Sequence, residues 1–167
     1  MAEVVIILGS PSDQSWAQRI VEGLRRFDIP AEIRVASAHK TPAYLLDLLR
    51  EAEGRPGERV FITVAGRSNA LSGFVDAAVA APVIACPPAS EAFGGMDILS
   101  SLRMPSGVAP LAVLDPGNAA LAAAKMLALS DPALRDRIRG VQQEDRGRVI
   151  GADRELNREK EMQEMSS

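Results

Sequence analysis

Five short apolar runs recur along the chain, and a segment with helical spacing of its apolar residues separates each run from the next. The runs cover residues 4–8, 31–35, 60–64, 83–86 and 111–114. Runs of this length, rich in Val, Ile and Ala, predict strands that are buried on both faces of a sheet. Their regular alternation with helical segments therefore predicts a doubly wound parallel sheet of about five strands.

The helical segments predict the layers on either side of that sheet. The first segment carries Trp16, Ile20 and Leu24 on one face, which is typical of a helix that packs on a sheet. A further helix is expected around residues 96–102. The segment 118–129 is apolar on nearly every side, so we expect it to be buried all round, in part by a neighbouring subunit. The whole pattern favours an α/β fold, a single-domain three-layer sandwich of flavodoxin-like or Rossmann-like type.

The C-terminal part of the chain differs in composition from the rest. From about Arg135 the sequence is highly charged, and its last stretch has little apolar periodicity. We therefore expect one domain over residues 1–153 and a charged tail, helical or frayed, over residues 154–167.

The composition excludes several functional classes. The net charge of −3 and the pI near 5.3 argue against a broad nucleic-acid surface. No apolar run reaches the ~18 residues of a membrane span, and no signal-peptide pattern is present, so we expect a cytoplasmic protein. The chain has one histidine, His39, and one cysteine, Cys86, which is too few for a transition-metal site. We expect no metal and interpret Cys86 as a buried structural thiol.

Small polar loops follow the first three predicted strands. They are Gly9–Asp13, Ser37–Lys40 and Ala65–Asn69. Because ligands bind at the carboxyl ends of parallel strands, we expect these three loops to share one site. The first loop matches neither the Walker A nor the GxGxxG pattern, so nothing supports a nucleoside triphosphate or dinucleotide site.

The residue types in these loops indicate the chemistry of that site. Ser10 and Ser12 precede a helix, where hydroxyls and free amides bind anions, and the Arg67 guanidinium suits an anion as well. Asp13 suits a ribose hydroxyl better than a phosphate. His39 changes charge near neutral pH and can exchange a proton. The set predicts a phosphorylated small molecule that undergoes proton transfer.

Four motifs in order resemble those of the aminoimidazole ribonucleotide carboxylase, or PurE, family. They are Gly-Ser-x-Ser-Asp at 9–13, Ser-Ala-His-Lys at 37–40, Ala-Gly-Arg-Ser-Asn at 65–69 and Met-Pro-Ser-Gly at 104–107. The resemblance spans about residues 4–130. It implies a carboxy-lyase of de novo purine biosynthesis that acts on 5-aminoimidazole ribonucleotide. It also implies a homo-oligomer, commonly an octamer, that uses no metal, biotin or ATP.

The resemblance further implies a role for each matching loop position. The positions that should hold the ribose phosphate are Ser10, Ser12, Asp13, Ser37 and Lys40, with Asp13 toward the ribose hydroxyls. His39 should handle the proton at carbon 4 of the imidazole. Gly66, Arg67 and Ser68 should line the base or carboxylate end.

The same loops distinguish two branches of the family. The mutase branch moves a carboxylate from N5-carboxyaminoimidazole ribonucleotide to carbon 4, and usually has an arginine after Ser-Ala-His and a second histidine in the third loop. This chain has Lys40 and no second histidine, so it resembles the branch that uses carbon dioxide directly. The mutase is the first alternative. A flavodoxin-like binding or receiver module is the second, although aromatic residues and clustered acidic residues are sparse in the loops.

Overall fold

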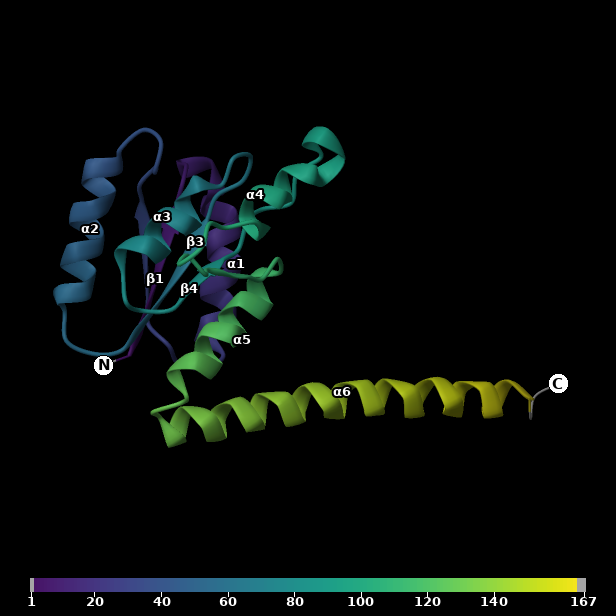
Figure 1. Cartoon of the computed structure of the whole chain (residues 1–167). Helices are drawn as coiled ribbons and strands as arrows, with labels where there is room; N and C mark the ends of the chain where they lie inside the picture. The colour runs from purple at the N-terminus through teal and green to yellow at the C-terminus, as the bar shows by residue number, and fades with distance from the viewer. Residues whose placement is uncertain (1, 165–167) are drawn as a thin grey trace.

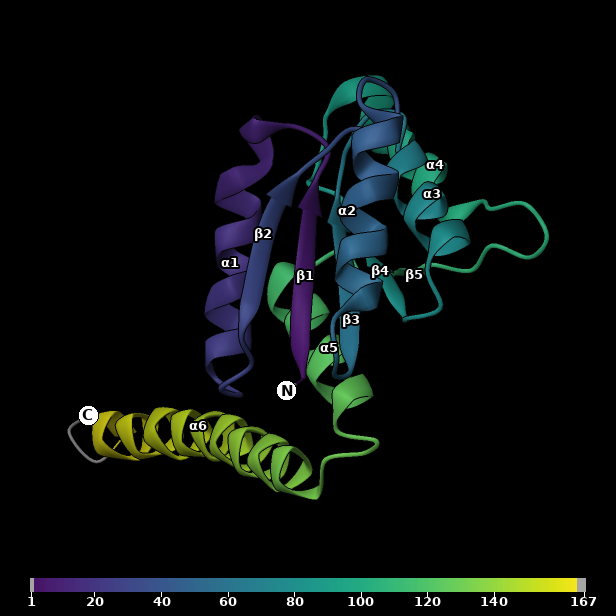
Figure 2. The same cartoon turned by 90° about the vertical axis from the view of Figure 1, so that its left-hand side faces the viewer.

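A five-stranded parallel sheet forms the centre of the computed structural model, which describes residues 2–164. Its order is β2-β1-β3-β4-β5 (Figure 2). The strands are β1 (Glu3–Leu8), β2 (Ala31–Val35), β3 (Arg59–Val64), β4 (Val83–Ala85) and β5 (Leu111–Ala112). This is the flavodoxin-like order, so the predicted α/β fold class is confirmed.

Helices cover both faces of the sheet and complete three layers (Figure 1). The helices are α1 (Gln14–Arg25), α2 (Pro42–Gly54), α3 (Ala70–Ala78), α4 (Leu99–Leu102), α5 (Pro116–Leu127) and α6 (Pro132–Glu164), with 3-10 turns η1 (Pro11–Asp13) and η2 (Ala92–Ile98). Alternate residues of β1 divide between the two resulting cores. Ile6 faces α1 and α5, whereas Ile7 faces α2 and α3.

The strand register places the predicted loops side by side. Leu8, the last residue of β1, lies opposite Val35 at the end of β2 and Val64 at the end of β3. The loops that follow these three strands therefore leave the sheet at one level. Helix α1 then runs to one face of the sheet, and α2 and α3 run to the other, so a crevice opens between the loops.

Helix α5 buries one of its faces within the chain itself. Its residues Ala119, Ala120, Ala123 and Ala124 are fully buried, and the helix packs closely on α1. A Cβ atom at Gly23 of α1 would lie only 2.7 Å from that of Ala120, so the glycine permits this close approach. The apolar residues on its other side, Leu121, Ala122 and Met126, are only half-buried, so cover by a neighbouring subunit stays a prediction.

Two predicted elements between β4 and α5 differ in the structure. The strand predicted over 111–114 shortens to Leu111–Ala112 at the edge of the sheet. The helix predicted around 96–102 is a 3-10 segment followed by one short α-helical turn. Phe93, Gly94 and Gly95 all have positive φ angles, so the chain turns sharply before α4 and cannot form one continuous helix.

Helix α6 extends away from the domain (Figure 1). Its first turns are attached, because Arg137 donates a hydrogen bond to the Phe27 carbonyl at 2.8 Å and Asp145 forms an ion pair with Arg26 at 2.9 Å. The helix passes residue 153 without a break, and residues 165–167 of the predicted tail lie outside the described residues. Despite its length α6 is polar, and no described helix is both long and apolar enough to cross a bilayer.

Candidate functional site

A cavity of about 550 Å³ lies at the carboxyl edge of β1, β2 and β3. Every residue that the sequence singled out for the site lines it. These residues are Ser10, Ser12, Asp13, Ser37, His39, Lys40, Gly66, Arg67 and Ser68. The remaining wall includes Leu71 and the segment Pro88-Ala89-Ser90, which follows β4. The structure therefore brings the three predicted loops into one site.

The first loop presents hydroxyls at the start of α1. Ser10 caps the η1 turn, and its Oγ accepts hydrogen bonds from the Ser12 amide at 3.3 Å and the Ser12 hydroxyl at 2.8 Å. Gly9 allows this loop to approach the third loop, because a Cβ atom there would lie 3.1 Å from the Cβ of Ala65. The loop thus offers small donors at a helix start, an arrangement that suits an anion.

Asp13 is the acidic side chain of this cavity. Burial, the largest influence, raises its pKa above the ordinary value, while hydrogen bonds with Ser10 and Ser12 and the charge of Arg67 act in the opposite direction. The folded protein therefore binds a proton at Asp13 more tightly than the unfolded chain does. The contribution of Asp13 to folding stability is fully present below the ordinary pKa of a free Asp carboxyl. It is lost as the pH rises through the higher pKa that Asp13 has in the folded protein.

Because burial raises the pKa of Asp13, we expect the Asp13→Asn variant to be more stable than the wild-type protein at pH 7. The amide carries no charge to desolvate, whereas at pH 3 the carboxyl of the wild-type protein is itself largely protonated and the advantage disappears. Urea unfolding at the two pH values measures the difference. The exposed Asp153 supplies the matched Asp→Asn control, for which we expect no such gain. An Asp13→Asn variant that is less stable than the wild-type protein at pH 7 would contradict the prediction.

The second loop is a closed turn that presents His39 and Lys40 at its tip. The Ser37 amide donates to Thr41 Oγ1 at 2.9 Å, and the Thr41 amide donates to the Ser37 carbonyl at 2.9 Å. The Lys40 amide donates to Ser37 Oγ at 3.3 Å. His39 is exposed, and its imidazole makes no hydrogen bond with any residue from 2 to 164. The ring is therefore available to a ligand in the cavity.

The third loop is held by residues that sequence reasoning did not assign. Asn69 is 3% exposed and caps α3, because its Oδ1 accepts the Ser72 amide at 3.2 Å. Its Nδ2 also donates to Ser101 Oγ at 2.9 Å. Asn69 precedes an alanine-rich helix, which is a recognisable capping signal. Arg67 has a φ of 59°, an uncommon conformation for a residue other than glycine, and such strain gathers at functional loops.

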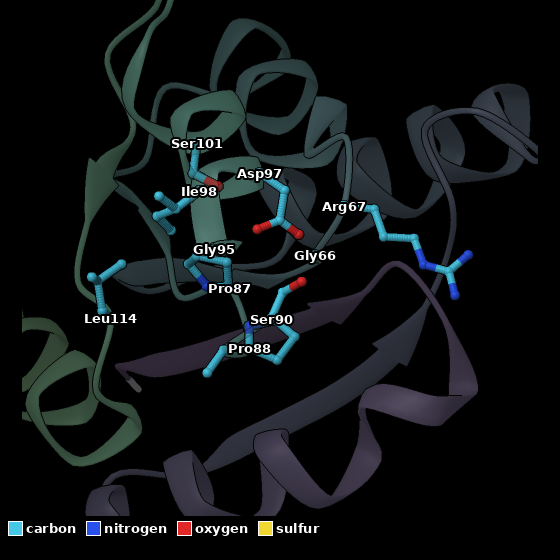
Figure 3. A pocket seen from close by; sticks show the side chains of 11 residues that line it. Gly66, Arg67, Pro87, Pro88, Ser90, Gly95, Asp97, Ile98, Ser101 and Leu114 are labelled. Carbon is cyan, nitrogen blue, oxygen red and sulfur yellow. The ribbon is translucent and has the colours of Figure 1, made fainter. Parts of the chain in front are cut away.

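A second cavity of about 260 Å³ adjoins the first beyond the third loop. The two share Gly66, Arg67, Pro88, Ala89 and Ser90. Figure 3 shows this second cavity, which also includes Gly95, Asp97, Ile98 and Ser101. Sequence reasoning missed this part because it assigned the region around residues 96–102 to a regular helix. The Gly94-Gly95 pair was the available signal, since two glycines favour a turn.

Two further sequence predictions are resolved near the site. Cys86 is fully buried, and burial raises the pKa of its thiol to about 11, so the interpretation as a structural thiol is confirmed. The motif Met104–Gly107 lies outside both cavities of this chain. Met104 packs on α3 instead, where a Cβ atom at Gly73 would lie 3.1 Å from its sulfur.

Comparisons with known proteins agree with the motifs. The family model described as AIR carboxylase matches residues 3–148. The chain is 53% identical over 154 residues to a phosphoribosylaminoimidazole carboxylase of Archaeoglobus fulgidus, covering 92% of this chain and 84% of that protein. It is 46% identical to the protein of the same name from Treponema denticola, covering 93% and 98% respectively.

A solved structure extends the likeness to three dimensions. The crystal structure of Treponema denticola PurE superposes with a TM-score of 0.92 at 45% identity, covering 93% of this chain and 99% of that one. A human bifunctional phosphoribosylaminoimidazole carboxylase/phosphoribosylaminoimidazole succinocarboxamide synthetase is 41% identical over 136 residues, which make up 32% of the human protein. The likeness therefore includes both stand-alone relatives and a domain of a longer one.

Proposed function

This chain belongs to the AIR carboxylase family and is a PurE-type enzyme of purine biosynthesis, and from that premise we propose that it carboxylates 5-aminoimidazole ribonucleotide directly with carbon dioxide. The product is 4-carboxy-5-aminoimidazole ribonucleotide. The observation that carries the proposal is the single imidazole of the cavity, His39, followed by Lys40. A second histidine, usual in the third loop of the mutase branch, is absent from the sequence.

The cavity divides into parts that suit the parts of this nucleotide. Ser10, Ser12, Ser37 and Lys40 hold the phosphate through hydroxyls, amides and one cation. Asp13 accepts hydrogen bonds from the ribose hydroxyls. Gly66, Arg67 and Ser68 line the base and the new carboxylate, for which the guanidinium and the backbone amides are donors. His39 exchanges the proton at carbon 4.

The reaction needs few protein groups. The amino group makes carbon 4 nucleophilic, so that carbon attacks carbon dioxide and becomes tetrahedral. His39 then removes its proton and the ring becomes aromatic again. Holding the two reactants together supplies roughly 7–11 kcal/mol of the barrier, and a positioned base adds about 10²–10⁴-fold. The proposed route uses no ATP, metal or biotin.

A direct assay distinguishes this route from the mutase. We expect the purified protein to form the carboxylated product from 5-aminoimidazole ribonucleotide and bicarbonate without ATP, with a rate that rises with dissolved carbon dioxide. Freshly prepared N5-carboxyaminoimidazole ribonucleotide serves as the alternative substrate. Turnover of only this second compound would make the enzyme a mutase. Absorbance of the purified protein would reveal a bound flavin if the chain were a binding module instead.

We also propose that the enzyme acts as a homo-oligomer, of the octameric kind, in the cytoplasm. An exposed apolar patch on η2 and α4 supports the assembly, because large exposed apolar areas mark interaction surfaces. Its members are Phe93, Met96, Leu99 and Leu102. The single buried thiol, Cys86, suits a reducing compartment.

A further inference from the structure

Asp97 is an acidic side chain of the second cavity that the reaction described above does not use. Its Oδ2 is buried and has no hydrogen-bond partner within residues 2–164. None of the salt bridges among these residues includes Asp97. Buried polar atoms in folded proteins are nearly always paired, and a desolvated carboxylate oxygen without a donor is costly. An unpaired carboxylate beside a cavity therefore indicates a missing donor.

The direction of this carboxylate identifies where that donor should lie. In Figure 3 the Asp97 carboxylate points toward Ser90 and into the space beside Gly66, whereas the Arg67 side chain extends away from it. Ser90 and Gly66 also line the larger cavity, so the two cavities adjoin at this point. A ligand whose phosphate lies at the first two loops would therefore extend its opposite end toward the cavity that Asp97 lines.

Asp97 is also fixed relative to the third loop. Ser100 Oγ lies 2.7 Å from the Asp97 carbonyl and 2.9 Å from the Arg67 carbonyl, and it accepts a hydrogen bond from the Asn69 amide at 3.0 Å. One hydroxyl therefore connects the segment that carries Asp97 to the loop that lines the base. Groups held in this way lose little entropy when a ligand binds.

We infer that Asp97 accepts a hydrogen bond from the exocyclic 5-amino group of the imidazole and stabilises the positive charge that develops there. This inference rests on the proposed function. When the electron pair of the enamine forms the bond from carbon 4 to carbon dioxide, the nitrogen at carbon 5 becomes iminium-like and the carbon dioxide becomes a carboxylate. Loss of the carbon 4 proton then restores the neutral amine. Asp97 itself gains and loses no proton.

The sign of the charge also fixes the orientation of the base. A carboxylate attracts the amino group and repels the new carboxylate on the adjacent ring carbon. Asp97 therefore turns carbon 5 toward the second cavity and leaves carbon 4 in the larger cavity, which His39 lines. A preorganised charge that faces a developing charge stabilises the transition state more than the ground state.

The test compares two ligands in two proteins. One ligand is 5-aminoimidazole ribonucleotide, and the other is the same nucleotide without the 5-amino group. We expect the wild-type protein to bind the amino compound roughly tenfold or more tightly, as for a hydrogen bond to a charged group. Asp97→Ala should reduce this ratio to near one, and leave the affinity for ribose 5-phosphate unchanged. Asp136→Ala, on α6 and far from both cavities, is the matched control.

The outcomes separate this inference from the proposed function. A wild-type protein that does not carboxylate 5-aminoimidazole ribonucleotide overturns the proposed function. A wild-type protein that does so, with an affinity ratio that Asp97→Ala leaves unchanged, overturns the role of Asp97 alone. If Asp97→Ala does not fold, Asp97→Asn keeps the side-chain volume and removes the charge. We then expect a smaller affinity ratio and a kcat about tenfold to a hundredfold lower, as for the loss of a hydrogen bond to a charged group. Unchanged values of both the ratio and kcat would overturn the inference.

Discussion

His39→Asn should lower kcat by about 10²–10⁴-fold while the dissociation constant for 5-aminoimidazole ribonucleotide changes only a few-fold. Asparagine has a similar polar shape but cannot exchange the carbon 4 proton. The fold should be unaffected, because the imidazole is exposed and makes no hydrogen bond with any residue that the structure describes. Steady-state kinetics and equilibrium binding of the nucleotide together measure the two effects.

The neighbouring lysine supplies the comparison for this variant. Lys40→Met keeps the length of the side chain and removes a charge that the proposal assigns to phosphate binding. Its KM should rise while kcat stays near the wild-type value, since that contact is the same in the ground state and the transition state. Near-normal turnover in His39→Asn would remove His39 from the mechanism. A loss of nucleotide binding in that variant would assign it to binding instead.

Leu45→Ala should lower the free energy of unfolding by about 2–5 kcal/mol. Leu45 is fully buried in the core beneath α2, and its truncation leaves a cavity there. This is a large part of the roughly 5–15 kcal/mol that stabilises a typical domain. Urea unfolding, followed by far-UV circular dichroism at fixed protein concentration, measures the change.

The same substitution at an exposed leucine is the control. Leu129, at 80% exposure beyond the end of α5, should tolerate Leu129→Ala within about 0.5 kcal/mol. Leu45 also lies in the first turn of α2, where its amide donates to the Thr41 carbonyl at 3.0 Å, directly after the His39 loop. Leu45→Ala should therefore reduce activity as well as stability. Equal losses of stability in the two variants would contradict the burial argument.

The sheet and the main cavity were predictable because both follow from local signals. A continuous apolar run such as residues 60–64 is too short for a typical helix and rich in β-branched residues, which together favour a buried strand. Once the strands are parallel, the polar residues at their ends must gather at one edge, which is where His39 and Arg67 lie. The site could therefore be assembled from sequence without any knowledge of side-chain contacts.

The parts that were missed depend on tertiary contacts. The apolar pattern of α5 indicates burial, but only the close approach of Gly23 to Ala120 shows that α1 provides it. Asp97 likewise reads as an ordinary polar residue in a short helical segment. Its unpaired carboxylate oxygen becomes evident only when the left-handed turn at Gly94 and Gly95 brings the segment to the cavity. Sequence periodicity carries no information about such a turn.

The ends of β1, β2 and β3, which lie at one level, form a rigid base for the site. The amides of Gly9 and Ala36 donate to the carbonyls of Val64 and Leu8 at 2.9 Å, so the cavity rests on the central hydrogen-bond ladder. Backbone amides in such a ladder open to solvent only when most of the domain unfolds, whereas loop amides open independently. The spacing between the three loops of the site is therefore kept by the part of the protein whose amides we expect to exchange most slowly with solvent.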